Sequence, residues 1–166
     1  GGISVSTNGI TWTSVTSNVA SGSTVSGVAY NPNVTNKYVA VGTTGLIRTS
    51  TNGVTWVTQT SGLPTTNGFA GVATSLGSSG NVYVATLTTA SVVYYAASTD
   101  GVTWSTGSIT AQNSNVTTLP GYGGGVTYSL GSYIISPNPG NTYNYQLVYS
   151  TNGTTWSSAN INQFVP

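Results

Sequence analysis

One heptapeptide occurs four times in the chain and limits how the chain can fold. The copies lie at residues 6–12 (STNGITW), 50–56 (STNGVTW), 98–104 (STDGVTW) and 150–156 (STNGTTW). They hold all four tryptophans, which are separated by 44, 48 and 52 residues, and the only acidic residue, Asp100. A motif that returns at this interval indicates a repeat architecture, and a period in the forties is typical of a four-stranded propeller blade.

The residue types within the heptapeptide are those of a tight hairpin turn. The defining positions are Ser6, Asn8, Gly9 and Trp12; Ser50, Asn52, Gly53 and Trp56; Ser98, Asp100, Gly101 and Trp104; and Ser150, Asn152, Gly153 and Trp156. Such turns need a positive φ, which Gly adopts without steric cost and which Asn or Asp tolerates. The Asn or Asp side chain can accept a hydrogen bond from the amide two residues on, and the Ser and Thr can satisfy further turn amides. The motif therefore predicts a structural turn followed by a strand that begins with a buried Trp.

Alternating apolar patterns around the motif predict short antiparallel strands. The expected strands are 25–30, 37–41, 46–50 and 56–60; then 68–74, 81–87, 92–98 and 104–109; and finally 125–130, 133–136, 145–150 and 156–161. Residues 1–16 give only one hairpin, which matches the third and fourth strands of a blade. No segment of helical length has apolar spacing near 3.6 residues, and β-branched residues dominate. The sequence predicts an all-β, propeller-like array of three full blades (23–62, 63–116 and 117–166) after a partial blade (1–22).

The heptapeptide resembles the Asp-box, or bacterial neuraminidase repeat, whose pattern is S-x-D-x-G-x-T-W on the hairpin that joins the last two strands of a blade. Here the pattern is S-T-(N/D)-G-x-T-W, one residue shorter before Gly, with Asn in three of the four copies. Residues 28–56 (VAYNPNVTNKYVAVGTTGLIRTSTNGVTW) look like a blade of sialidase-like and photosystem-assembly-factor-like propellers. The resemblance covers essentially the whole chain as repeats. It implies that the box residues form turns distant from any active site.

Charged side chains are nearly absent, and His and Cys are missing, which excludes most catalytic chemistry. The chain has Lys37, Arg48 and Asp100 but no Glu, His or Cys. Glycoside hydrolysis ordinarily needs two carboxylates, and the Ser-His-Asp and Cys-His mechanisms need residues that the chain lacks. The usual metal ligands are missing for the same reason. We expect a non-catalytic member of the resembling family, without cofactor or metal.

The low charge also limits the classes of partner. With a net charge of +1 and two basic residues, the chain has too few cations to bind nucleic acid by counterion release. It contains no apolar run near the length of a membrane helix, so we expect no membrane insertion. Eleven tyrosines and four tryptophans argue against disorder. Low charge with abundant Ser, Thr and Asn favours an extracellular or virion surface.

Three side chains are candidates for contact with a glycan or a protein partner. Arg48 lies on the predicted strand before the second box, either as a solvated strand residue or as a hydrogen-bond donor in a groove or interface. Tyr95 and Tyr145 offer aromatic surface for stacking on sugars, although strand alternation places about half of such residues in the sheet packing. Residues 121–125 (GYGGG) lack the strand-to-helix context of a phosphate loop. We interpret them as a flexible link between blades.

The strand count leads to a functional expectation. The partial blade lacks its first two strands, so we expect either a segment of a longer chain or an open module whose edges a partner caps. The expected function is a non-catalytic structural or interaction module of an extracellular or virion surface assembly, such as a fibre protein, filament or adhesin. Its partners would be other subunits or the rest of a longer chain. The alternatives are a carbohydrate-binding, lectin-type propeller and a non-catalytic segment of a larger glycan-active enzyme.

Overall fold

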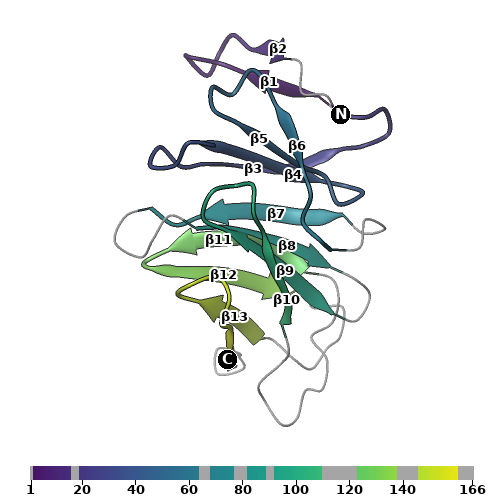
Figure 1. Ribbon diagram of the computed structural model, residues 1–166. Coiled ribbons are helices and arrows are strands. Elements are labelled where there is room, and N and C mark those ends of the chain that lie inside the picture. The colour runs from purple at the N-terminus through teal and green to yellow at the C-terminus, as the bar shows by residue number, and fades with distance from the viewer. Residues whose placement is uncertain are drawn as a thin grey trace.

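A computed structural model describes residues 2–15, 19–63, 68–76, 82–88, 92–109, 123–137 and 146–160 of the chain (Figure 1). The half-blade consists of β1 (Ile3–Val5) and β2 (Thr13–Val15). Blade 1 contains β3 (Val25–Tyr30), β4 (Tyr38–Gly42), β5 (Ile47–Ser50) and β6 (Val57–Gln59). Blade 2 contains β7 (Phe69–Thr74), β8 (Tyr83–Thr88), β9 (Val93–Ser98) and β10 (Ser105–Ile109). Blade 3 contains β11 (Gly123–Ser129), β12 (Ser132–Pro137), β13 (Gln146–Ser150) and β14 (Ser157–Asn160).

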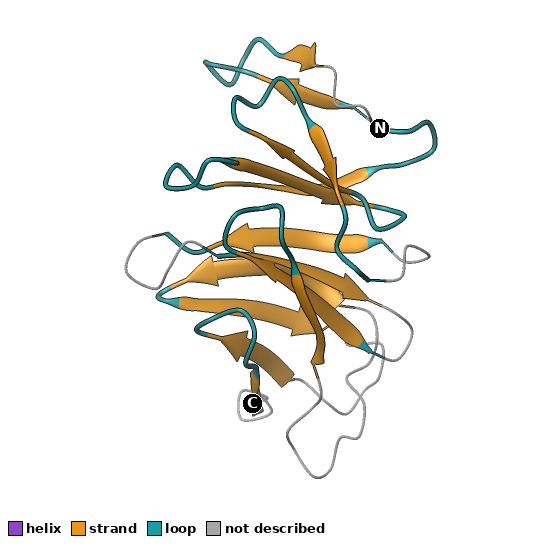
Figure 2. Ribbon diagram, viewed as in Figure 1, coloured by secondary structure: helices purple, strands orange, loops and turns teal. Residues whose placement is uncertain are grey.

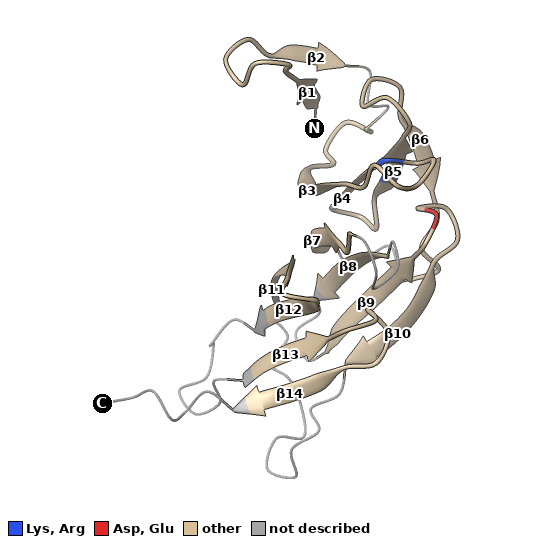
Figure 3. Ribbon diagram, turned by 90° about the vertical axis from the view of Figure 1, so that its left-hand side faces the viewer, with Lys and Arg blue, Asp and Glu red and all other residues tan. Residues whose placement is uncertain are grey.

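Every sheet is an antiparallel meander in which strands pair in chain order. The described residues form strands, turns and loops without a helix, as Figure 2 shows. The predicted all-β fold with four-stranded antiparallel blades is therefore confirmed. In Figure 3 the sheets follow one another along an arc, with the half-blade at one end and blade 3 at the other. The innermost strands β3, β7 and β11 pack successively against one another.

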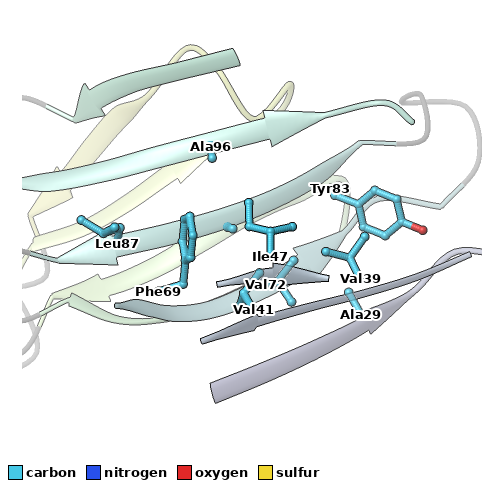
Figure 4. Packing of buried hydrophobic residues seen from close by; sticks show 10 residues of the cluster. Ala29, Val39, Val41, Ile47, Phe69, Val72, Tyr83, Leu87 and Ala96 are labelled. Carbon is cyan, nitrogen blue, oxygen red and sulfur yellow. The ribbon is translucent and has the colours of Figure 1, made fainter. Parts of the chain in front are cut away.

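Successive side chains of a strand point to opposite faces of its sheet, so each complete blade has apolar side chains on both faces. These side chains are buried where the blade packs against its neighbour. Val39 and Val41 of β4 point toward blade 2, where they meet Tyr83 and Leu87 of β8 (Figure 4). Val84, between those last two residues, points the other way into the core shared with blade 3. The cores between blades are thus formed by opposite faces of the same short strands.

The innermost strands of neighbouring blades approach each other closely at glycines, where no side chain separates the two backbones. Gly27, Gly71 and Gly125 occupy the same position in β3, β7 and β11, next to an irregularity in each strand's pairing. A Cβ on Gly27 would lie 3.2 Å from the Cα of Gly71, and a Cβ on Gly71 would lie 3.1 Å from the Cα of Gly125. The prediction that residues 121–125 form a flexible link is wrong for residues 123–125, which belong to β11. The close approach requires glycine at Gly71, whose added Cβ would meet the backbone of Gly125, rather than at Gly125 itself.

Polar contacts join the loops that connect the first and second strands of successive blades. Asn31, buried after β3, donates from Nδ2 to Thr74 Oγ1 and to the carbonyl of Ser75, both at 3.0 Å. Tyr83 Oη donates to the carbonyls of Asn36 at 2.8 Å and Lys37 at 2.9 Å in blade 1. These bonds satisfy polar groups that blade stacking would otherwise bury without partners.

The same contact recurs one blade further on. Tyr133 Oη donates to the carbonyl of Val82 and accepts a hydrogen bond from the amide of Ser75 at 3.0 Å. Burial raises the pKa of both Tyr83 and Tyr133, so both hydroxyls stay protonated at neutral pH. Each full blade after the first is therefore fixed to its predecessor by a tyrosine at the start of its second strand.

The glycine contact predicts unequal effects of one substitution at two equivalent positions. Gly71→Ala forces a methyl group against the backbone of β11, and we expect a loss of about 1–3 kcal/mol in the free energy of unfolding. Gly125→Ala is the matched control, because its new Cβ would meet only the carbonyl oxygen of Ala70, at 4.0 Å. Denaturant midpoints of both variants test this prediction. An equal loss at the two positions would show that the close approach is not what requires glycine.

Candidate functional site

Each copy of the heptapeptide is closed by the same side-chain to backbone hydrogen bonds. In the second copy, Ser50 Oγ accepts from the amides of Asn52 at 3.3 Å and Gly53 at 2.8 Å. Asn52 Oδ1 accepts from the amides of Val54 and Thr55, both at 2.9 Å. The bond from the Gly amide to the Ser hydroxyl measures 2.8 Å in all four copies. The side-chain oxygens of the motif are therefore used within the turn.

The box glycine and tryptophan complete the turn. All four box glycines have positive φ, between 72° and 79°. The indole N–H donates to the carbonyl of the box glycine in the first three copies, at 3.3 Å for Trp12, 3.0 Å for Trp56 and 3.1 Å for Trp104. Trp156 Nε1 is buried and has no acceptor among the described residues. Trp12 is 62% exposed, whereas Trp56 and Trp156 are buried.

Asp100 performs in the third turn the role that Asn performs in the others. Its Oδ1 accepts from the amides of Val102 at 2.7 Å and Thr103 at 2.8 Å and from Ser98 Oγ at 2.9 Å. Partial desolvation acts to raise the pKa of the carboxyl, but these hydrogen bonds outweigh it and hold the pKa of Asp100 below its ordinary value. The only carboxylate side chain in the sequence is thus held in a structural turn.

Arg48 lies at a position that is apolar in the other blades. It pairs across the sheet with Ala40 and is only 8% exposed. The equivalent cross-strand pairs are Ala85 with Ala96 in blade 2 and Ile135 with Val148 in blade 3. The interpretation of Arg48 as a solvated strand residue is wrong. The half-blade covers this face of blade 1, where Ile3 packs with Ala40 and Trp56.

Arg48 borders a pocket of about 280 Å³. Its lining includes Thr44 from the β4–β5 turn, Gln59 at the end of β6, and Ser61. Gln59 Nε2 donates to Thr49 Oγ1 at 2.9 Å, which holds the amide in place. The pocket thus combines one cation with hydroxyl and amide groups.

Of the two tyrosines predicted to contact a glycan or partner, the structure describes only Tyr95. Tyr95 of β9 lies between blades 2 and 3, with its ring centroid 5.9 Å from that of Trp156. It is part of the packing between blades rather than an open platform for a sugar. Tyr145 lies outside the described residues. The structure therefore places Arg48 and Tyr95 apart, with Arg48 at the pocket of blade 1 and Tyr95 in the core between blades 2 and 3.

A second hollow, of about 710 Å³, separates the half-blade from blade 1. We call it the inter-blade groove, and its walls include Ile3 and Trp12 from the half-blade and Val28, Tyr38 and Trp56 from blade 1. The groove and its lining could not be predicted from the sequence, because they depend on how the half-blade sits against blade 1.

The described ranges contain no helix that is long and apolar enough to cross a membrane. In the same part of the chain, no three His, Cys, Asp or Glu side chains gather in a group that could hold a metal ion.

The fold and these features define a propeller-like array of four-stranded blades whose shared motif is a structural turn. No protein-family model matches the chain, and no curated protein matches it. Among solved structures, the chain is similar to the β-propeller YCF48 from Cyanidioschyzon merolae, with a TM-score of 0.58 and 19% sequence identity. The similarity covers 86% of this chain and 42% of that one, so this chain spans less than half of YCF48. At this identity the likeness shows the fold alone.

The buried turns predict a specific stability loss. Ser50→Ala removes the acceptor for the buried amide of Gly53, and we expect unfolding to become easier by about 1–3 kcal/mol. Ser6→Ala is the control, because the same bonds in the first copy are exposed and water can replace the hydroxyl. Urea denaturation of both variants makes the measurement. A loss for Ser6→Ala as large as that for Ser50→Ala would contradict the prediction.

We expect the wild type and the Asp100→Asn variant to differ in stability only at acidic pH. Because folding lowers its pKa, the ionised carboxylate stabilises the native state above the unfolded pKa of about 4. That contribution is lost as the pH falls through the lower folded pKa. Asp100→Asn installs the residue of the other three turns, so we expect equal behaviour near pH 7 and a smaller acid loss in the variant. Urea midpoints measured from pH 2 to pH 7 test this, and parallel curves would refute it.

Proposed function

We propose that the chain is a non-catalytic structural and interaction module of an assembly on an extracellular or virion surface. A fibre protein, a filament or an adhesin is the kind of protein in which it would serve. The proposal rests on one observation: the polar side chains of the repeat form hydrogen bonds within their own turns. The Ser and Asn or Asp oxygens of all four boxes bind turn amides. They stabilise the blades, and they include the only carboxylate side chain of the sequence, that of Asp100.

The charge of the chain supports the same proposal. A net charge of +1 gives almost no electrostatic repulsion between molecules and no field that would steer a charged substrate. Proteins close to zero net charge associate readily. Recognition by such a surface depends on shape, backbone pairing and hydroxyl or amide contacts. These are the means by which a fixed module holds its neighbours.

One observation favours carbohydrate binding as a second candidate. The 280 Å³ pocket next to Arg48 presents a cation together with Thr44, Gln59 and Ser61, which suits the hydroxyls of a sugar. Against it, Tyr95 is occupied in packing against Trp156. A non-catalytic segment of a larger glycan-active enzyme is a third candidate, and it requires catalytic residues from outside this chain.

Surface location is the direct test of the proposal. We expect an antibody raised against the purified chain to label the outside of the intact cells or particles that carry it. Protease added to the intact material should remove that label, and cross-linking in place should join the chain to a neighbouring protein. Label that appears only after the material is opened would contradict the proposal.

A glycan array separates the second candidate from the first. The structural module should show no saturable glycan binding. Binding that is lost in Arg48→Ala and kept in Lys37→Ala would instead favour the carbohydrate-binding function, because only Arg48 borders the pocket.

A further inference from the structure

Arg48 departs from the pattern that the other complete blades follow. It lies two residues before the box serine, as Ala96 does in β9 and Val148 does in β13. This position is buried in all three blades, with exposed fractions of 8%, 0% and 2%. Blades 2 and 3 therefore show that an apolar side chain meets the needs of the fold here.

A buried guanidinium is costly at a position where an apolar side chain would serve. Taking a charge out of water costs several kcal/mol, and replacing a buried ionic side chain by a well-packed apolar one is often neutral or stabilising. The guanidinium cannot avoid this cost by losing its proton, because arginine stays charged in proteins. Departures of this kind from a local rule are expected at functional sites. Arg48 is therefore a candidate for binding a ligand.

The pocket beside Arg48 combines hydroxyl-bearing residues with apolar ones. Thr58 pairs with Arg48 across β5 and β6, so the two side chains lie on the same face of the sheet, and both residues line the pocket. Further lining residues are Thr44, Ser61, Leu46 and Leu63. Such a mixture suits a small molecule that has both polar groups and a carbon skeleton.

The charge of the pocket determines the sign of the ligand. Arg48 is the one charged residue among the described residues that line it. The only carboxylate side chain in the sequence, that of Asp100, lies outside this lining and accepts hydrogen bonds in the box turn of blade 2. A guanidinium presents two parallel N–H donors that match the two oxygens of a carboxylate. The pocket therefore favours a carboxylate.

The volume of the pocket limits the size of the ligand. A space of about 280 Å³ has room for roughly nine water molecules, because each occupies about 30 Å³ in the liquid. Drug-sized ligands occupy larger pockets, of about 300–1,000 Å³. The space therefore suits an acid of roughly ten non-hydrogen atoms.

We propose that this pocket binds a small hydroxycarboxylate through Arg48. The carboxylate pairs with the guanidinium, and the hydroxyl groups of the acid bond to polar groups of the lining. The inference goes beyond the proposed function, because it gives a structural module a ligand of its own. The acid is a free molecule or an acidic sugar unit of a glycan, and the recognition chemistry is the same in both. All the described lining residues fall within 20–63, so the site can be tested on this chain.

Titration calorimetry of the full chain tests the pocket with two acids, D-glucuronate and D-glycerate. We expect saturable one-to-one binding of at least one of them. The matching amides, D-glucuronamide and D-glyceramide, should bind about tenfold or more weakly, because a neutral group replaces the carboxylate at nearly the same shape. Binding of D-glucuronate would assign the site to a sugar acid, and binding of D-glycerate alone would assign it to a free acid.

Two leucine variants provide the matched control. Arg48→Leu installs an apolar side chain of the kind that the other blades use, and it should weaken acid binding about tenfold or more. Lys37→Leu removes the same charge from a residue outside the lining, so binding should be unchanged. Arg48→Lys keeps the charge but loses the planar fork, and we expect it to weaken binding roughly two- to tenfold.

Urea denaturation separates a ligand-binding role of Arg48 from a purely structural one. Without ligand, the urea midpoint of Arg48→Leu should equal or exceed that of the wild type, because the other blades hold an apolar side chain at this position. With saturating acid, only the midpoint of the wild type should rise, since a ligand stabilises the state that binds it. A less stable variant together with a wild type that gains nothing from either acid would assign Arg48 to the fold alone.

Four results would overturn the inference. They are the absence of saturable binding of either acid, equal binding of the acids and their amides, equal losses in Arg48→Leu and Lys37→Leu, and stronger binding of N-acetyl-L-glutamate methylamide than of either acid. The last result would make the occupant an acidic side chain of a polypeptide, whether from a partner or from a longer form of this chain. Surface labelling without acid binding removes this inference alone, whereas acid binding without surface labelling removes only the proposed function.

Discussion

Every blade has two apolar faces, and the rest of the structure depends on covering both. A four-stranded sheet with alternating side chains cannot bury Val39 and Val41 on one face and Ala40 on the other unless something packs on each side. The glycines of the innermost strands set how near the neighbouring sheet comes. The hydroxyls of Tyr83 and Tyr133 then fix the position of each blade relative to the one before it, because they donate hydrogen bonds to backbone carbonyls in the loops of that blade. The arc of sheets is the result of one interface repeated.

The chain achieves this with almost no ionised groups. In most proteins surface charges supply solubility and bind exposed backbone at turns, but here Ser and Asn side chains bind the turn amides. Such neutral hydrogen bonds are barely screened by salt, unlike surface ion pairs. The repeat is therefore held together by neutral hydrogen bonds, and Asp100 is the one charged side chain among its box residues.

The local part of this structure could be predicted from the sequence. Turn chemistry and alternating strands depend on neighbours within a few residues, so the strands of blades 1 and 2 lie within one or two residues of their predicted bounds. The burial of Arg48 could not be predicted, because its sheet face, which it shares with Ala40, packs against Ile3 from more than forty residues earlier in the chain. Residues 123–125 were misjudged because glycine serves both flexible links and close backbone contact, and composition alone does not separate the two. The place of Tyr95 beside Trp156 likewise depends on how two blades meet.

The local closure of each box turn also bears on how the chain reaches its fold. A turn whose amides are bound by side chains two or three residues away forms without waiting for distant segments. Each blade therefore contains its own starting point, and a formed blade offers its face as a template for the next. In repeat proteins of this kind, stability is approximately a sum of unit and interface terms. The array can thus grow from any of several nuclei, with the number of units set by the length of the chain rather than by any single contact.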